Sequence, residues 1–231
     1  MRKAALVLLL GVALAANASA AFALPLVLVE LFTSQGCSSC VKSGELIAAI
    51  DQRPHVLTLT FPVDYWDYLG WRDTLAKPEF DERQRVYMRS LALRDVYTPQ
   101  VVVNGRLQAA AVDRETIEKL VKAAGRTPGD PPDVTLGKTR LAVGSGEAPP
   151  GGADVWLVGY VAGDQSVRVL AGENRGQTIV EHNVVRELKR LGAWKGRPVR
   201  FRVPASSDKD LQTVAIVQAV HSGRILAVGR P

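Results

Sequence analysis

Two cysteines, Cys37 and Cys40, are the only ones in the 231-residue chain, and two residues separate them. They follow an apolar run at 26–32, which is typical of a strand buried on both faces, and they precede a helical spacing of apolar residues at 43–50. A disulfide that closes so short a loop stabilises a fold by only about 2 kcal/mol, against about 4.7 kcal/mol for a loop of roughly one hundred residues. The pair therefore favours thiol–disulfide exchange over structural cross-linking.

The position of Cys37 predicts that it is the nucleophile of the pair. A strand that ends at Phe32 and a helix that begins near Cys40 would place Cys37 at a helix N-terminus, where free N–H groups and the helix dipole stabilise an anion. No carboxylate lies between Gln35 and Lys42, and Lys42 adds a positive charge. We expect Cys37 to be an exposed thiol with a lowered pKa that attacks, and Cys40 to resolve the mixed disulfide.

Two other roles for the cysteine pair stay open on the sequence. One is an inert structural disulfide of an exported protein. The other is a metal site, but a closed zinc site usually takes four Cys or His ligands, and the chain adds only His55, His182 and His221 to the pair. We expect no metal and no cofactor, and we expect His182 to be a hydrogen-bonded histidine of the fold.

The first 23 residues carry the pattern of a secretory signal peptide. A basic head at 2–3 is followed by an apolar stretch at 4–16. Two small-x-small cleavage sequences follow, at 18–20 and 21–23. Cleavage after Ala20 or Ala23 would leave a periplasmic or secreted protein without a membrane span. An uncleaved anchor is the alternative, although Asn17 interrupts the stretch and makes it short for a span. Export places the cysteines in an oxidising compartment, where disulfides persist.

The first half of the mature chain alternates strand and helix patterns in the order β-α-β-α-β-β-α. The strands are expected at 26–32, 56–61, 100–103 and 106–111, and the helices at 43–50, 78–93 and 114–124. Asn104-Gly105 predicts a hairpin turn, and Asp113 and Gly125 cap the last helix. Because a helix joins the first strand to the second and another joins the second to the third, we expect these strands to be parallel.

The second half has the pattern of an all-β sandwich of roughly one hundred residues. Short strand patterns alternate there with Gly-rich turns, at 134–143, 155–161, 167–170, 199–203, 214–220 and 225–228. The segment 187–191 fits either a strand or a helix. A linker rich in Pro and Gly at 127–133 would divide an α/β domain with a central mixed sheet, at 24–126, from a β-sandwich domain at 134–231.

Charge and motifs exclude several classes of function. The chain has 29 Lys and Arg against 23 Asp and Glu, a net charge of +6, with no run of five like charges and no interleaved aromatic residues. This pattern indicates solubility rather than nucleic acid binding. The motifs Gly-x-Ser-x-Gly and His-Glu-x-x-His do not occur, so hydrolase and metalloprotease chemistry has no support.

Thr98-Pro99, just before the third expected strand, adds to the cysteine pattern. With the element order, these features resemble the thioredoxin-like superfamily and, within it, the exported bacterial DUF1223 family. The matching stretches are 30–40, 63–67, 69–71, 83–84, 97–100 and 102–105. The resemblance implies a thioredoxin-like domain, Cys37 and Cys40 as the redox pair, and Pro99 as a cis-proline facing it. Val41-Lys42 stands where such proteins often have prolines.

We therefore expect an exported thiol–disulfide oxidoreductase whose partners are protein thiols or disulfides of the cell envelope. Thr98 and Pro99 would bind the substrate beside the sulfurs, and Tyr65 and Trp66, in the aromatic loop after the second strand, would complete a groove for it. The alternative for Tyr65 and Trp66 is packing beneath the second helix. The alternative for the protein is a non-catalytic cell-envelope binding module, in which the disulfide only shapes a loop.

Overall fold

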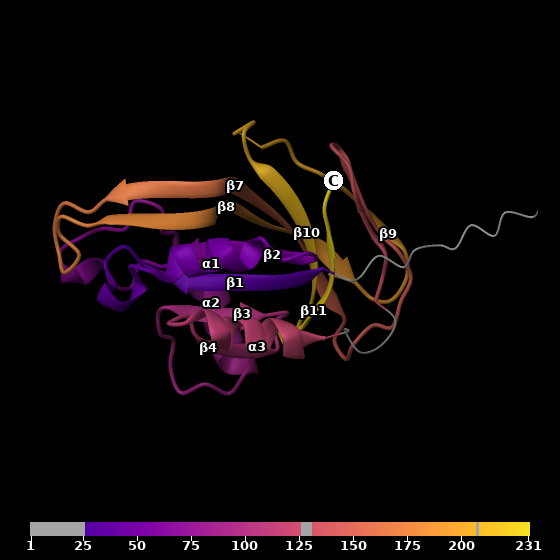
Figure 1. The fold of residues 1–231 in the computed structure, drawn as a ribbon. Helices are drawn as coiled ribbons and strands as arrows, with labels where there is room; N and C mark the ends of the chain where they lie inside the picture. The colour runs from indigo at the N-terminus through magenta and orange to yellow at the C-terminus, as the bar shows by residue number, and fades with distance from the viewer. Residues whose placement is uncertain (1–25, 126–130, 207) are drawn as a thin grey trace, which may run out of the picture.

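The chain is built around one large β-sheet, and a computed structural model describes residues 26–125, 131–206 and 208–231. Eight strands form this mixed sheet in the order β11-β10-β7-β8-β2-β1-β3-β4, and a separate small sheet has the order β5-β6-β9 (Figure 1). The architecture is mixed α/β, as predicted. The expected signal peptide at 1–23 and most of the expected linker lie outside the described residues.

The described elements before residue 125 follow the sequence pattern closely, with ends displaced by at most three residues. The helices are α1 (Ser43–Asp51), α2 (Pro78–Ser90) and α3 (Arg114–Ala124). The strands are β1 (Val27–Thr33), β2 (Val56–Pro62), β3 (Gln100–Val103), β4 (Leu107–Ala110), β5 (Val134–Leu136), β6 (Arg140–Val143), β7 (Ala153–Arg168), β8 (Thr178–Trp194), β9 (Val199–Arg202), β10 (Gln212–Ala219) and β11 (Ile225–Gly229).

Strand pairing in the first half confirms one prediction and corrects another. β1 and β2 are parallel, from Val27 opposite Val56 onward, and β3 and β4 form the expected antiparallel hairpin. The prediction that the second and third strands are parallel neighbours is wrong, because β3 pairs antiparallel with β1. Gln100, the first residue of β3, lies opposite Phe32 near the end of β1. The segment after α2 thus returns the chain to that end of the sheet, and β3 runs back.

Helices on both faces explain why β1 and β2 are apolar throughout. Val29 belongs to a core cluster with Ile47 of α1 and Ile117 of α3. Phe32 faces the other way, with its ring centroid 6.0 Å from that of Tyr87 in α2. Burial of each such side chain stabilises the fold by about 1.5–3 kcal/mol. The side chain of Asp113 accepts a hydrogen bond from the Thr116 amide, so the predicted cap of α3 is confirmed.

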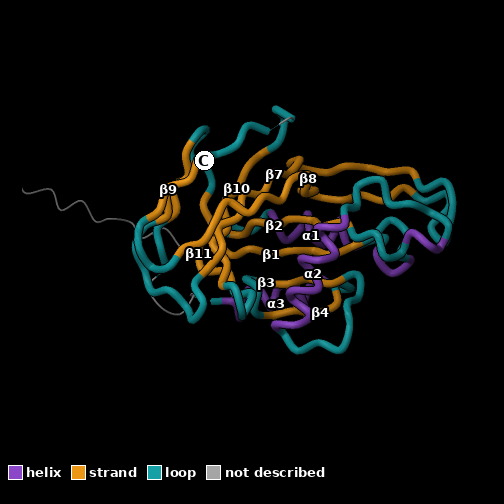
Figure 2. The backbone as a smooth tube through the Cα atoms, turned by 180° about the vertical axis from the view of Figure 1, so that it is seen from behind, coloured by secondary structure: helices purple, strands orange, loops and turns teal. Residues whose placement is uncertain are grey.

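The second half does not form the expected self-contained sandwich, because four of its strands extend the sheet of the first half. β8 meets β2 at Thr60 opposite Val184, and β7, β10 and β11 follow outward (Figure 2). The small sheet packs on β7 and β10 through a cluster that includes Leu141 and Val155, while Val158 on the other face of β7 joins the core under α2. β7 and β10 are apolar on both faces, so the small sheet covers one face and α2 covers the other.

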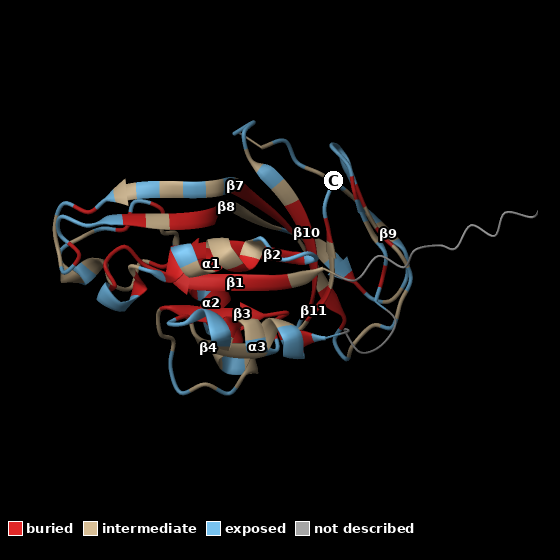
Figure 3. Ribbon diagram, in the orientation of Figure 1, coloured by how far each residue is buried: buried red, intermediate tan, exposed pale blue. Residues whose placement is uncertain are grey.

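β7 and β8 are far longer than the short strands predicted for this region, and 187–191 is part of β8. Together they form a hairpin that extends along the sheet toward the end of β1 (Figure 1). The half of β7 nearer the turn alternates between exposed and half-buried residues, whereas its other half is mostly buried (Figure 3). The hairpin thus reaches from the core of the second half to the loop after β1, which carries the cysteines.

Candidate functional site

Cys37 and Cys40 form a disulfide in the loop between β1 and α1, with their Cα atoms 5.3 Å apart. Ser38–Cys40 make a single 3-10 turn, and Cys37 is its N-terminal cap residue. The α-helix expected to begin near Cys40 begins only at Ser43, so the prediction that Cys37 lies at the N-terminus of an α-helix is wrong. A three-residue turn provides little of the dipole that was expected to acidify Cys37.

The prediction that Cys37 is exposed is also wrong. Cys37 is 3% exposed and Cys40 is 1% exposed. The turn of the β7–β8 hairpin lies against this loop, and there the side-chain amide of Asn174 donates to the carbonyl oxygens of Gln35 at 2.9 Å and Cys37 at 3.0 Å. Between the two cysteines, Ser38 and Ser39 are exposed. The sequence offered no sign of this contact, because Asn174 lies in a turn more than 130 residues from the cysteines.

The environment of the Cys37 sulfur is nevertheless partly polar. The Ser39 hydroxyl lies 3.3 Å from Cys37 Sγ and donates to the carbonyl oxygen of Thr98 at 3.5 Å. The Thr98–Pro99 peptide bond is cis. The Ser39 hydroxyl therefore lies between the Thr98–Pro99 peptide bond and Cys37 Sγ, and its single proton can turn from the Thr98 carbonyl to donate to a Cys37 thiolate.

The aromatic loop after β2 forms a second wall of this site. Trp66 Nε1 donates to the Thr98 hydroxyl at 2.7 Å. A Cβ atom placed on Gly36 would lie 3.3 Å from Trp66 Cβ, so Trp66 lies directly against the cysteine loop. Tyr65 instead points toward α2 and donates to Gln84 Oε1 at 3.2 Å, and burial raises its pKa. Trp66 therefore borders the site, whereas Tyr65 packs beneath the helix.

Gln35 ties the cysteine loop to the end of the aromatic loop. Its backbone N–H donates to Asp73 Oδ2 at 2.8 Å, and its side-chain oxygen accepts from Trp71 Nε1 at 3.0 Å. Burial raises the pKa of Asp73. Asp67 accepts a hydrogen bond from the Asp73 amide and thus stabilises a turn. The backbone N–H of Asp64 donates to Asp81 Oδ1 at 3.1 Å.

Glu181 in β8 is a buried carboxyl that the sequence did not reveal. It is 1% exposed, and neither carboxyl oxygen has a hydrogen-bond partner within the described part of the chain. Gln165 lies opposite it on β7, and the side-chain nitrogen of Gln165 is likewise buried without a partner there. Burial, and secondarily the charge of Asp73, raise the pKa of Glu181 well above its ordinary value.

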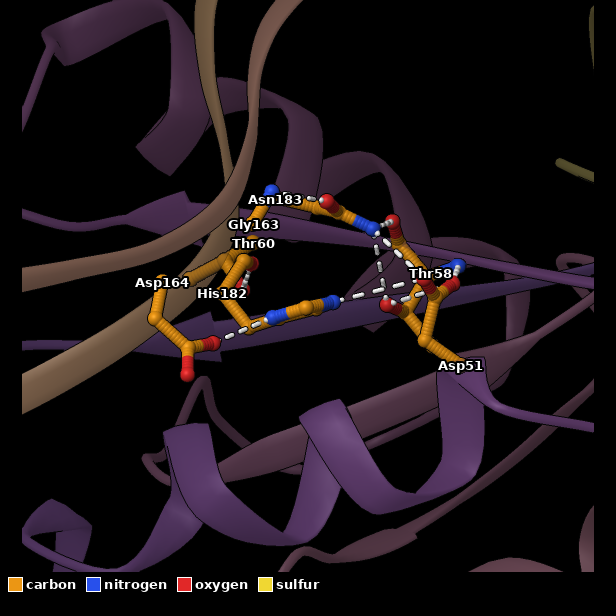
Figure 4. Close-up of polar contacts among 7 residues, drawn as sticks. All are labelled: Asp51, Thr58, Thr60, Gly163, Asp164, His182 and Asn183. Carbon is orange, nitrogen blue, oxygen red and sulfur yellow. Dashed lines mark hydrogen bonds and ion pairs between the residues drawn. The ribbon is translucent and has the colours of Figure 1, made fainter.

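His182, the next residue, is hydrogen-bonded as predicted (Figure 4). Its ring bridges two carboxylates, with Nδ1 bonded to Asp164 on β7 and Nε2 3.3 Å from Asp51 at the end of α1. Asn183 has φ of 50° and donates to Asp51 Oδ2 at 3.1 Å. The hydrogen bond to Asp51 is the main cause that raises the pKa of His182, and the bond to Asp164 adds to it. This network ties the β7–β8 hairpin to α1.

A cavity of about 260 Å³ lies between α2 and strands β7 and β10, with Glu79, Trp156 and Val220 in its lining, and none of the predicted site residues lines it. Among residues 26–125, 131–206 and 208–231, no group of three His, Cys, Asp or Glu side chains is placed to hold a metal ion. Within those same ranges no helix has both the length and the apolar character needed to cross a membrane.

Comparisons with known proteins agree with this architecture. The X-ray crystal structure of a protein from Agrobacterium tumefaciens, a structural genomics target, is similar at 33% identity with a TM-score of 0.70, over 87% of this chain and 90% of that one. HBP35 of Porphyromonas gingivalis shares the fold at 13% identity and a TM-score of 0.55, over 90% of this chain and 74% of its own. No curated protein matches. Residues 28–218 match the family model described as "Protein of unknown function (DUF1223)", and the chain belongs to that family.

Proposed function

We propose that this protein is an exported thiol–disulfide oxidoreductase whose first half is a thioredoxin-like domain. The observation that carries the proposal is the Cys37–Cys40 disulfide, with the Ser39 hydroxyl 3.3 Å from Cys37 Sγ and 3.5 Å from the carbonyl oxygen of Thr98. The order of elements in the first half and the signal-peptide pattern at 1–23 support it. The substrates are protein thiols or disulfides of the cell envelope.

In the proposed reaction, the Cys37 thiolate attacks one sulfur of a substrate disulfide and releases the other substrate sulfur as a thiolate. Cys40 then loses its proton and attacks Cys37 Sγ in the mixed disulfide. The protein disulfide forms, the substrate leaves as a dithiol, and two electrons have passed from the protein to the substrate. The reverse sequence oxidises a substrate dithiol. The Ser39 hydroxyl would stabilise the Cys37 thiolate in both directions.

Burial of both cysteines favours a second candidate, a non-catalytic binding module with a structural disulfide. In this case the ligand would contact the exposed side of the aromatic loop. Tyr68 is 77% exposed and stacks on Trp66 at a centroid distance of 6.4 Å, so it presents a flat apolar face. Aromatic side chains of this kind are frequent in binding surfaces.

Trapping of the mixed disulfide tests the proposed function. The reduced Cys40→Ser variant is incubated with ribonuclease A that carries mispaired disulfides, and covalent complexes are counted by non-reducing electrophoresis and mass spectrometry. We expect a complex through Cys37 that dithiothreitol releases, and none from Cys37→Ser, because only the first thiol attacks. Equal trapping by both variants, or by neither, contradicts the proposal and favours the binding module.

A further inference from the structure

The turn of the β7–β8 hairpin, residues 169–177, is in direct contact with the cysteine loop, and we call it the hairpin tip. Asn174 at its centre is 1% exposed. Both hydrogen bonds of its amide nitrogen go to backbone carbonyls of the cysteine loop, at Gln35 and Cys37. Its oxygen accepts from Gln177 Nε2 at 3.3 Å. The side chain therefore joins the two halves of the chain at the disulfide.

Two close backbone approaches hold the hairpin tip and the strand that follows it in place. Gly172 has φ of 72°, and a Cβ atom there would lie 3.1 Å from Trp71 Cβ in the aromatic loop. A Cβ atom on Gly44, at the start of α1, would lie 1.8 Å from the carbonyl oxygen of Val180. A side chain at position 44 would collide with the backbone of β8, and one at position 172 would be strained and tight against Trp71, so the hairpin packs closely on both α1 and the aromatic loop. Asn174 lies between Gly172 and Val180 along the hairpin and is hydrogen-bonded to the Cys37 carbonyl.

We propose that Asn174 determines which thiols reach the Cys37–Cys40 disulfide. A thiol must approach a sulfur in line with the disulfide bond, and the exchange rate depends on that access. With the hairpin tip bound to the carbonyls of Gln35 and Cys37, the approach is confined to the exposed Ser38-Ser39 side. A small dithiol fits this approach with little movement, whereas a folded protein can attack only after the tip has moved. This inference rests on the proposed function, because it concerns the partners of the same disulfide.

The test compares two reductants of very different size, dithiothreitol and reduced thioredoxin. With either one, a thiolate of the reductant attacks one protein sulfur and releases the other as a thiolate. The second thiol of the reductant then closes on the mixed disulfide, so the reductant leaves oxidised and the protein holds two thiols. The reduction rate is followed in the full mature chain by quenched alkylation and mass spectrometry.

Asn174→Ala removes both hydrogen bonds of the amide nitrogen. We expect reduction by thioredoxin to become about tenfold faster or more, because the loss of two hydrogen bonds lowers the free energy needed to open the tip. Reduction by dithiothreitol should become less than about threefold faster, because this small dithiol needs little opening. Arg175→Ala is the matched control, because Arg175 is an exposed neighbour in the same tip and makes neither bond. It should leave both rates within about twofold of the wild type, the scatter usual for surface substitutions.

Asn174→Asp provides a second variant in case Asn174→Ala unfolds, which circular dichroism would show. The Asp carboxylate would face two carbonyl oxygens and repel them. Relative to the wild type, this variant should therefore accelerate reduction by thioredoxin more at pH 8 than at pH 5. Equal acceleration of both reductants in either folded variant, or no acceleration, overturns the proposal. The proposed function and this inference can fail separately. If thioredoxin is accelerated selectively but Cys40→Ser traps no substrate, Asn174 controls access to the disulfide, and only the oxidoreductase function is refuted.

Discussion

At the residue scale, the two serines between the cysteines differ in whether they contact the Cys37 sulfur. Both Ser38 and Ser39 are exposed, but only the Ser39 hydroxyl lies within hydrogen-bonding distance of Cys37 Sγ. The sequence predicted that Thr98 and Pro99 lie beside the cysteine pair. It could not distinguish the two serines, because the direction of each side chain depends on the 3-10 turn. The same turn removes the α-helix dipole on which the predicted pKa of Cys37 relied.

Ser39→Ala should raise the pKa of the Cys37 thiol in the reduced protein by roughly one unit, because a hydrogen bond to a charged group is lost. Ser38→Ala is the matched control and should leave this pKa unchanged. The measurement is the alkylation rate of Cys37 as a function of pH in a Cys40→Ser background. If the two serine variants give the same pKa, Ser39 does not stabilise the thiolate.

Glu181 shows what sequence patterns cannot reveal about a single residue. Glu181, His182 and Asn183 interrupt the apolar alternation, and no strand was predicted there. His182 and Asn183 contact Asp51 and Thr58, which lie far away in the chain. A buried carboxyl without a hydrogen-bond partner destabilises a fold, and it does so most when it is ionised in the unfolded state.

Glu181→Gln should therefore stabilise the protein by about 1–3 kcal/mol at pH 7.5, because the amide does not need the proton that the buried carboxyl must take up on folding, at about 1.4 kcal/mol per pH unit above the unfolded pKa. The pKa of Glu181 is raised in the folded state, so the folded protein holds a proton that the unfolded chain loses as the pH rises above the ordinary value of 4.5. The stability of the wild type thus falls with rising pH in this window, and the advantage of the variant should vanish near pH 4. Urea denaturation at both pH values measures it.

The exposed Glu173 of the hairpin tip supplies the control for this charge change. Glu173→Gln should alter the free energy of unfolding by less than about 0.5 kcal/mol at either pH. A Glu181→Gln variant that is less stable than the wild type at pH 7.5 would show that the carboxylate is ionised and paired, which would refute a neutral buried carboxyl at this position.

At the scale of elements, local signals were reliable and long-range pairing was not. The hairpin at Asn104-Gly105 and the cap of α3 at Asp113 were predicted because the deciding residues are neighbours in the sequence. The direction of β3 was missed, since it depends on where the chain returns to β1. The length of β7 and β8 was missed because bulges and polar residues divide them into pieces that look like short strands.

His182 joins three elements, and its contribution to stability should depend on pH. Its pKa is raised above the ordinary value of 6.5, so the stabilisation is complete below that value and is lost as the pH rises through the folded pKa. His182→Gln should lower the free energy of unfolding by about 1–2 kcal/mol more at pH 6 than at pH 9. Most of this difference should come from the interaction with Asp51, because the Asp164 carboxylate is 60% exposed and screened by solvent. Denaturation at the two pH values gives the difference.

His221→Gln is the control, since His221 is exposed and lies outside this network. It should show no such dependence on pH. A cost of His182→Gln that is equal at both pH values would mean that the neutral imidazole makes the same contacts, and the charged bridge would be refuted.

At the scale of the whole molecule, the two halves share one sheet and one core. The core cluster under α2 contains Phe61 and Val63 from the first half with Val158, Val185 and Ile216 from the second. The sequence indicated two fold patterns on either side of a linker, and composition cannot show that strands from both patterns join at Thr60 and Val184. Removal of the second half would expose the edge of β2 and this apolar face.

A fragment of residues 24–126 should therefore fail to fold cooperatively, although its elements match the first half of the sheet. We expect near-native helix content without a sharp thermal transition, together with aggregation through the exposed edge. Circular dichroism and calorimetry of the fragment beside the full mature chain check this. A cooperative transition in the fragment at the temperature of the full chain would show that the first half folds independently.

The Cys37–Cys40 disulfide should exchange with partner thiols, and its reduction potential tests this central claim most directly. The mature protein is equilibrated with glutathione buffers of graded composition, and the reduced fraction is counted by alkylation and mass spectrometry. We predict a potential between about −120 and −270 mV, the range of proteins that exchange disulfides. A potential below about −300 mV, typical of structural disulfides, would contradict the claim.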